Sequence, residues 1–258
     1  MRTKHFVKAL ILFTSLALIG AGCSKKPPVS TNANVGTNTV STTTISDACG
    51  NPYYPFKEGL TISYRVTPST GATGDSDYTI RIVSVTGTTA TIRTEMVGGV
   101  TADLEADCAS GSVALKGSSG LDSVMEGVTF KTTVISSSGT FMPANVAAGS
   151  TWSNSETIKM EATGGSAASL GPITLTTTES SRAIGEESVR VQAGTYKAMK
   201  VELTRTITST FAGASAIKIP PSTSTSTEWW VKGIGMVKTI TISDGETSTT
   251  EVKSVTGL

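Results

Sequence analysis

The chain has 258 residues, and its 21 basic and 20 acidic side chains leave a formal net charge of +1. A near-neutral chain without basic blocks lacks the electrostatic surface that nucleic acid requires, which excludes nucleic acid as a partner. The one histidine, His5, lies within the first 22 residues. The rest of the chain therefore has no Ser-His-Asp or Cys-His catalysis and no histidine metal site.

The first 22 residues have the layout of a secretory signal. Basic residues within the first eight positions are followed by an apolar stretch at 9–19, and small residues at 20–22 lead into Cys23. The apolar stretch is shorter than a usual membrane span, which favours a cleaved signal over an N-terminal anchor helix.

The small residues before Cys23 resemble the lipobox of bacterial lipoproteins, although Gly20 stands where that family prefers leucine. The resemblance implies cleavage before Cys23 and attachment of a diacylglyceryl group to its thiol. We expect a lipid-anchored protein at the cell membrane or outer membrane, facing the periplasm or the exterior. Residues 23–46 then form a disordered Ser/Thr/Pro-rich tether with a reach of about 25 Å.

Two further cysteines, Cys49 and Cys108, lie in the remaining chain. An even pair in an exported protein predicts a disulfide, which would close a loop of about sixty residues. The alternative is a redox pair, but such pairs usually have a close C-x-x-C spacing, which is absent here.

Residues 47–258 have the pattern of one all-β domain. Apolar and polar residues alternate in "TIRIVSV" (79–85), "ATIRTEMV" (90–97), "MKVELTRTIT" (199–208) and "MVKTITIS" (236–243). In the last segment Ile240 and Ile242 share one face and Thr239 and Thr241 the other, with threonine expected toward solvent. We expect a single antiparallel, strongly curved sheet or partial β-barrel, preceded by the disordered tether.

A short internal echo links two segments of this domain. "YPFKEGLTISY" (54–64) and "MPANVAAGSTWS" (142–153) both run from proline to glycine and then to an apolar residue three positions later. The echo indicates two similar halves of one sheet, and it is too short to prove duplication. A two-domain arrangement stays open on length alone.

Three segments resemble the TapB-like group of exported, often lipid-anchored bacterial β-proteins: "NPYYPFKEGLTISYRV" (51–66), "RVQAGTYKAMKVE" (190–202) and "STEWWVKGIGMVKT" (226–239). Ile62 stands where the group usually has tryptophan, and Trp152 fills the equivalent place in the second echo. Val231 stands where an aromatic residue is common. The resemblance implies a curved antiparallel sheet or partial barrel and no established activity.

Trp229 and Trp230 form the most aromatic point of the chain. Adjacent strand residues point to opposite faces, so one indole is expected in the core. The other covers an edge, packs, or forms a ligand or partner surface. The pair is thus a candidate surface, with packing as the alternative.

Other candidate sites are weak. Asp75 and Asp77 form a fragment of a calcium loop, "SAIK" (215–218) has Ser-x-x-Lys spacing, and Glu186 and Glu187 are adjacent acids in a turn. Each lacks the companion residues that its chemistry requires. We expect no enzyme, no cofactor and no metal site.

Two functions remain. The first is a non-catalytic envelope protein that displays its β-domain for structural or protein-interaction purposes. The second is a binding module that holds an apolar ligand, such as a lipid or acyl chain, in the concave face of a half-barrel. A cavity lined by Val, Ile, Met and Trp favours the binding module, whereas a filled core favours display. A hydrolase with two converging carboxylates is a more distant third.

Overall fold

The computed structural model describes residues 50–68, 76–96, 101–119, 123–125, 128–162, 171–212 and 219–258. The expected signal, the tether, Cys23 and Cys49 lie outside the described residues, as do Asp75 and the "SAIK" segment. Within the described ranges, no helix is long and apolar enough to cross a membrane.

The described chain consists of strands and one short 3₁₀ turn, η1, at Ala109–Gly111. The strands are β1 (Thr61–Pro68), β2 (Ser76–Thr86), β3 (Thr89–Met96), β4 (Thr101–Asp107), β5 (Ala114–Ser119), β6 (Ser123–Met125), β7 (Val128–Gly139), β8 (Thr151–Ala162), β9 (Ile173–Val191), β10 (Gly194–Phe211), β11 (Ser222–Val231), β12 (Gly235–Ser243) and β13 (Glu246–Thr256).

All of these strands belong to one antiparallel sheet, in the order β5-β4-β3-β2-β1-β13-β12-β11-β10-β9-β8-β7-β6. Neighbours in the chain are neighbours in the sheet, with two exceptions: β5 and β6 lie at its two ends, and β1 pairs with β13, which joins the first strand to the last. The two ends of the sheet also approach each other, because Val113 and Met142 form an antiparallel bridge beside β5 and β7. The sheet is therefore a nearly closed barrel, which confirms the predicted fold class.

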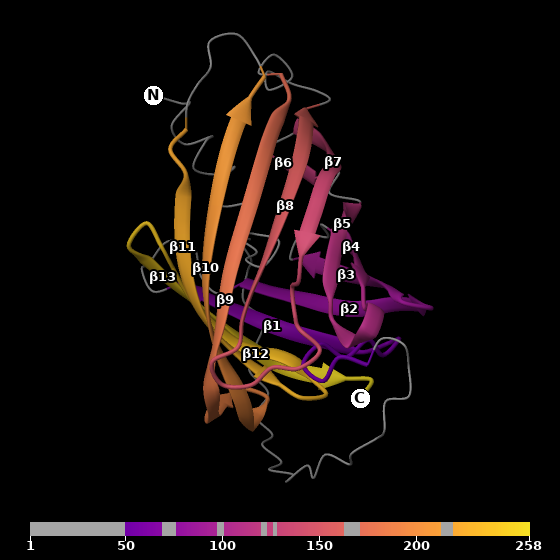
Figure 1. Cartoon of the computed structure of the whole chain (residues 1–258), viewed down its shortest axis with the longest axis vertical. Helices are drawn as coiled ribbons and strands as arrows, with labels where there is room; N and C mark the ends of the chain where they lie inside the picture. The colour runs from indigo at the N-terminus through magenta and orange to yellow at the C-terminus, as the bar shows by residue number, and fades with distance from the viewer. Residues whose placement is uncertain are drawn as a thin grey trace, which may run out of the picture.

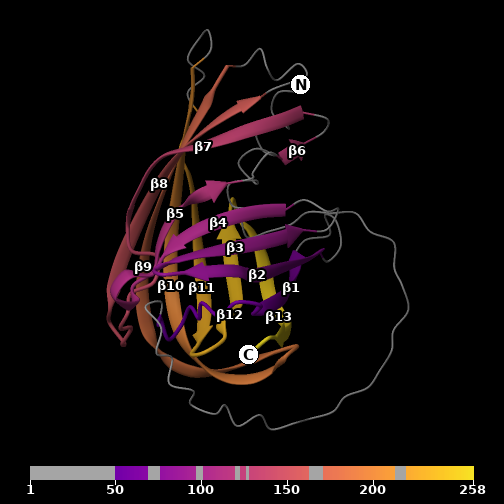
Figure 2. The same cartoon turned by 90° about the vertical axis from the view of Figure 1, so that its right-hand side faces the viewer.

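The barrel is formed by strands that run in two directions. Figure 1 shows β9, β10 and β11 as long, steep strands, while β1 and β2 run across them. In Figure 2 the lower ends of β9 and β10 curve beneath the sheet. The turn between them is tied to the last strand, because Ala193 N donates to Val252 O at 3.1 Å.

The two echo segments have the same local structure. Gly59 and Gly149 both have a positive φ, +83° and +87°, which glycine adopts without steric cost. Gly59 N donates to Ile82 O at 2.9 Å, and Gly149 N donates to Ala183 O at 2.8 Å. Each glycine therefore lies two residues before a strand, β1 or β8, and its N–H binds the next strand along the chain, β2 or β9. The echo thus marks two equivalent strand starts in one sheet.

For β12, the prediction that the threonine face points toward solvent was wrong. Ile242 is 49% exposed on the outside, whereas Thr241 bonds Ser226, a buried inner residue, at 2.9 Å. Thr239 lies opposite Glu228, which is also buried. The alternation was correct, but this part of the interior is polar, so threonine faces inward and isoleucine faces outward.

Candidate binding site

An apolar cavity of about 80 Å³ lies inside the barrel, and we call it the inner cavity. It is partly open, and its walls come from the segment before β1, from β1, β2, β10, β11 and β12, and from Phe141. The lining residues are Tyr54, Pro55, Leu60, Ile62, Tyr64, Ile80, Ile82, Phe141, Leu203, Arg205, Glu228, Trp230, Ile234, Gly235 and Met236. A cavity of about 150 Å³ can hold benzene, so this one suits a smaller group.

Three aromatic rings form one wall of the inner cavity. The ring centroids of Tyr54 and Trp230 are 6.0 Å apart, those of Tyr54 and Phe141 5.7 Å, and those of Phe141 and Trp230 6.1 Å. Phe141 meets the other two rings edge to face, and the rings of Tyr54 and Trp230 are tilted against each other by 37°. Offset and edge-to-face pairs at these distances are favourable. The wall therefore presents a stable group of aromatic surfaces.

Asn51 holds Tyr54 in this position. Its side chain is fully buried, and its Oδ1 accepts hydrogen bonds from the backbone N–H groups of Tyr53 and Tyr54, both at 2.9 Å. Its Nδ2 donates to Gly111 O at 2.8 Å and Pro143 O at 3.0 Å. One amide thus ties the segment before β1 to the place where the Val113–Met142 bridge brings the two ends of the sheet together.

Glu228 is the only acidic side chain of the described chain that lines the inner cavity. It is 8% exposed, and its Oε2 accepts a hydrogen bond from Trp230 Nε1 at 2.8 Å. Its other oxygen, Oε1, has no hydrogen-bond partner among the described residues. Burial raises the pKa of this carboxyl to about 7, because the charged form is poorly solvated inside the barrel.

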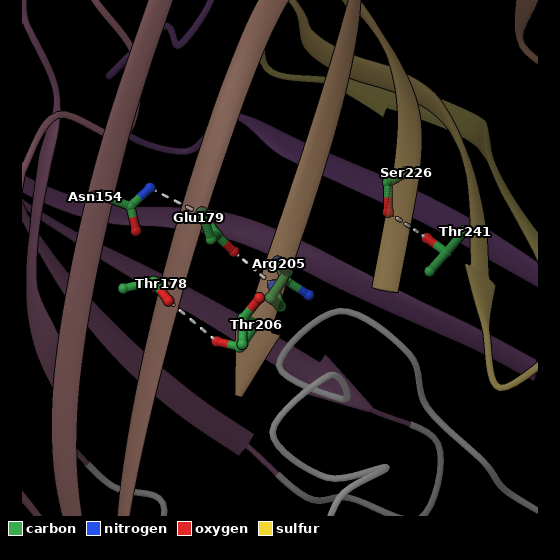
Figure 3. A network of polar contacts seen from close by, with 7 residues as sticks. All are labelled: Asn154, Thr178, Glu179, Arg205, Thr206, Ser226 and Thr241. Atoms are coloured by element: carbon green, nitrogen blue, oxygen red, sulfur yellow. Dashed lines mark hydrogen bonds and ion pairs between the residues drawn. The ribbon is translucent and has the colours of Figure 1, made fainter. Parts of the chain in front are cut away.

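A second polar group on the inner face consists of Asn154, Glu179 and Arg205 (Figure 3). Arg205 Nε is 2.5 Å from Glu179 Oε1, and Asn154 Nδ2 donates to Glu179 Oε2 at 3.0 Å. The side chains of Arg205 and Glu179 are only 12% and 7% exposed. Glu156 lies on the same wall, and burial, followed by the charge of Glu179, raises its pKa.

The tryptophan pair is divided between the two faces of the sheet. Trp230 faces inward and lines the inner cavity. Trp229 lies on the other face, where its Nε1 donates to Glu187 Oε1 at 2.6 Å and the Nζ atoms of Lys200 and Lys238 lie 5.8 and 5.9 Å from its ring. Trp229 is 8% exposed, so it is packed rather than displayed.

Of the two cysteines predicted to form a disulfide, only Cys108 lies among the described residues. Cys108 is fully buried beside η1. Gly50, next to Cys49 in the chain, lies beside the same turn, because a Cβ placed on Gly111 would be 3.6 Å from Gly50 O. Cys49 itself lies outside the described residues, so its bond to Cys108 stays a prediction.

In the described residues, the acids of the other candidate sites are engaged in ion pairs or hydrogen bonds. Asp77 is engaged by Arg65 and Lys253 at 3.2 and 2.5 Å, on the outer face. Glu186 binds Lys197 at 2.6 Å and Glu187 binds Trp229, so each acid has its own partner. Within the described ranges no group of three or more potential metal ligands occurs.

Sequence reasoning missed the charged residues of the interior. Arg205 occupies the inward position of a strand whose other inward residues, such as Leu203 and Ile207, are apolar. Glu228 likewise shares its face with Trp230. The usable signal was a charge at an apolar position of an alternating strand, because burying a charge is costly unless it has a structural or functional use.

The fold and this interior define an all-β protein with a nearly closed antiparallel barrel and an apolar inner cavity. The chain belongs to the DUF3108-like family, which matches residues 57–249. The matching family is not the TapB-like group, so the resemblance to that group stays an expectation from the sequence. No curated protein matches the chain.

Two solved structures are similar to this chain. One is a protein proposed to be exported, with a YmcC-like fold, from Bacteroides fragilis NCTC 9343 (TM-score 0.52, 13% identity, covering 80% of this chain and 99% of that one). The other is a proposed lipoprotein from Parabacteroides distasonis ATCC 8503 (TM-score 0.50, 14% identity, covering 80% and 98%). At these identities the likeness extends to the fold alone.

Proposed function

We propose that this chain is a lipid-anchored, extracytoplasmic protein of the bacterial envelope that acts without catalysis, and that its barrel binds a small, partly apolar ligand in the inner cavity. The observation that carries the proposal is the cavity itself, with apolar and aromatic walls and one carboxylate oxygen that has no described protein partner. Such a combination is typical of small-molecule sites, where few polar groups orient a ligand in an apolar pocket.

Export and anchoring are supported by the lipobox-like residues before Cys23 and by the resemblance to the TapB-like group. The descriptions of the two structural neighbours, one as exported and one as a lipoprotein, agree with this location. Membrane contact in this proposal is made through the lipid on Cys23.

The absence of catalysis is supported by the state of the interior acids. A hydrolase would need two carboxylates converging on one cleft. Among the described acidic residues only Glu228 lines the inner cavity, while Glu179 is engaged by Arg205 and Asn154. One carboxylate in an apolar cavity suits recognition better than acid–base work.

The cavity volume limits the ligand. At about 80 Å³ the inner cavity accommodates a small group rather than a whole acyl chain. The apolar-ligand carrier, which the sequence leaves open as the alternative to display, is therefore limited in this proposal to a module that binds small ligands or the small end of a longer one.

A substitution that fills the inner cavity with a larger side chain tests this proposal. Ile62 lines the cavity and stands where the TapB-like group usually has tryptophan, so Ile62→Trp should occupy the space at a cost of about 1–3 kcal/mol in stability. Residues 47–258 would be titrated with short alkyl alcohols, amines and carboxylates, followed by tryptophan fluorescence and thermal shift. We expect a saturable response that Ile62→Trp abolishes and that Ile242→Trp, on the exposed outer face, retains.

Display of the barrel for protein interaction is the second candidate. It is favoured by the rest of the core, which is filled by buried Ile, Val, Met and Tyr side chains packed around the cavity. A flat response to every small molecule, together with a cooperative melt, would favour display over ligand binding.

A further inference from the structure

We propose that the inner cavity recognises a small organic ammonium ion, with the cation held between the aromatic wall and the carboxylate of Glu228. This inference rests on the proposed function, because it names the chemical class of the ligand that the cavity takes. Three observations carry it: the aromatic wall, the position of Glu228, and the charge balance of the inner face.

The aromatic wall supplies electron-rich surfaces on the side of the cavity that Tyr54, Phe141 and Trp230 form. Their centroids lie 5.7–6.1 Å from one another, so an alkylated cation placed in the adjoining space would meet more than one ring. Such rings attract cations through their quadrupoles, and quaternary ammonium groups are bound in this way by aromatic cages.

Glu228 supplies the charge opposite in sign to the ligand. Trp230 Nε1 holds its Oε2 at 2.8 Å, which fixes the carboxylate at the cavity wall. Its Oε1 has no hydrogen-bond partner among the described residues, although the side chain is 8% exposed. A buried carboxylate with one free oxygen is costly, and a ligand cation beside it would remove that cost.

The charge balance of the inner face points to a cation as well. Three carboxylates, of Glu156, Glu179 and Glu228, face the interior, and among the described residues Arg205 is the cation that pairs with one of them. Arg205 pairs with Glu179 at 2.5 Å; it also lines the cavity and its charge acts on Glu228, but no ion pair joins the two among the described residues. Three carboxylates thus share one guanidinium on the inner face. Burial raises the pKa of both Glu156 and Glu228, as expected for acids that lack a balancing charge.

Other ligand classes fit less well. A metal ion would need several oxygen, nitrogen or sulfur ligands, and the described chain has no such group. An anion would meet Glu228, while the one nearby guanidinium already faces Glu179. An alkylated ammonium ion combines a positive charge with methyl groups, which match both the carboxylate and the apolar walls.

The test uses choline, whose trimethylammonium end would enter the partly open cavity while its hydroxyethyl group stays at the opening. It is compared with 3,3-dimethyl-1-butanol, which has the same shape but a neutral carbon in place of the nitrogen. Both would be titrated against residues 47–258 by calorimetry, with tryptophan fluorescence as a second readout, because Trp230 lines the site. We expect saturable choline binding that is at least about tenfold tighter than that of the neutral compound. Equal or tighter binding of the neutral compound overturns the ammonium proposal and leaves the small-ligand function standing. Binding of neither compound at millimolar concentration, with a flat response to the wider panel, overturns both.

Variants assign the preference to named groups. Glu228→Gln keeps an acceptor for Trp230 Nε1, so it should preserve the geometry and remove the difference between the two compounds. Glu202→Gln, on the exposed face of β10, is the matched control and should change neither affinity. If Glu228→Gln does not fold, Phe141→Leu serves instead, since loss of one ring should weaken choline and spare the neutral compound. A choline preference that survives the folded variants overturns the proposal.

Discussion

Trp230 and Glu228 lie two residues apart on β11 and are joined inside the barrel by a hydrogen bond of 2.8 Å from the indole Nε1 to the carboxylate Oε2. The same strand face thus places an aromatic ring and a buried acid at one cavity. Burial raises the pKa of this acid and so is expected to make the stability of the barrel depend on pH, while the neighbouring indole gives the cavity a spectroscopic reporter.

Glu228 should make the folded barrel less stable as pH rises. Its pKa is about 7 in the folded protein and near 4.5 in the unfolded chain. Between these values the folded state holds a proton that the unfolded state has lost, so stability falls as pH rises from about 4.5 to about 7. The loss contributed by this group is at most about 3 kcal/mol.

Urea unfolding of wild type and Glu228→Gln at pH 5 and pH 8 measures this contribution. The variant should gain stability relative to wild type at pH 8 and much less at pH 5. The neighbouring Glu156, Glu179, Arg205, Tyr64 and Tyr78 are present in both proteins, so their effects largely cancel in the difference. A wild type and variant with parallel pH profiles would contradict the prediction.

The ion pair of Arg205 and Glu179 should be costly to break from one side. Both side chains are largely buried, and Arg205→Met would leave Glu179 with Asn154 as its described partner. We expect a loss of about 3–5 kcal/mol in the free energy of unfolding. The double variant Arg205→Met/Glu179→Leu should recover much of it, because an apolar pair removes the uncompensated charge.

An exposed pair provides the control for that experiment. Lys197 and Glu186 are 2.6 Å apart, with side chains 76% and 36% exposed. Lys197→Met should leave the unfolding midpoint nearly unchanged, since water solvates both groups. A comparable loss at the two sites would show that burial does not set the energy.

Cys49 and Cys108 should form a disulfide in the exported protein. Cys108 is fully buried, and Gly50 lies beside the turn that follows it. Closing a loop of about sixty residues should stabilise the fold by roughly 4 kcal/mol in the chain-entropy model. Non-reducing peptide mapping checks the bond, and recovery of both thiols in alkylated form would refute it.

Lipid on Cys23 should decide where the protein resides. The intact mass of membrane-extracted protein is expected to begin at Cys23 and to include acyl chains. Cys23→Ala should either release the protein or leave the signal uncleaved. Soluble wild-type protein that retains residues 1–22 would disprove lipidation.

Much of the architecture was predictable from local patterns. Period-two alternation in β2, β3 and β10 predicted half-buried strands, and the buried Ile92, Met96 and Val201 agree with it. The glycines of the two echo segments marked strand starts that the structure shows to be equivalent. These features were readable because alternation and positive φ depend on neighbouring residues alone.

The candidate site depended on long-range closure. Nothing local shows that Tyr54, Phe141 and Trp230 meet, since they come from distant parts of the chain and Asn51 holds the first of them in place. Alternation also does not say which face of a strand is inside. In β12 the apolar face turned outward, because closing the barrel placed Glu228 and Ser226 opposite the threonines.

The sequence by itself determined the strands, the alternation of their faces and the leader-like N-terminus, because each of these is a property of a few consecutive residues. Only the tertiary structure decided that a buried acid, an ion pair and three aromatic rings share one interior. The physical reason is that the cost of burying Glu228 and Arg205 is set by what the closed sheet places around them.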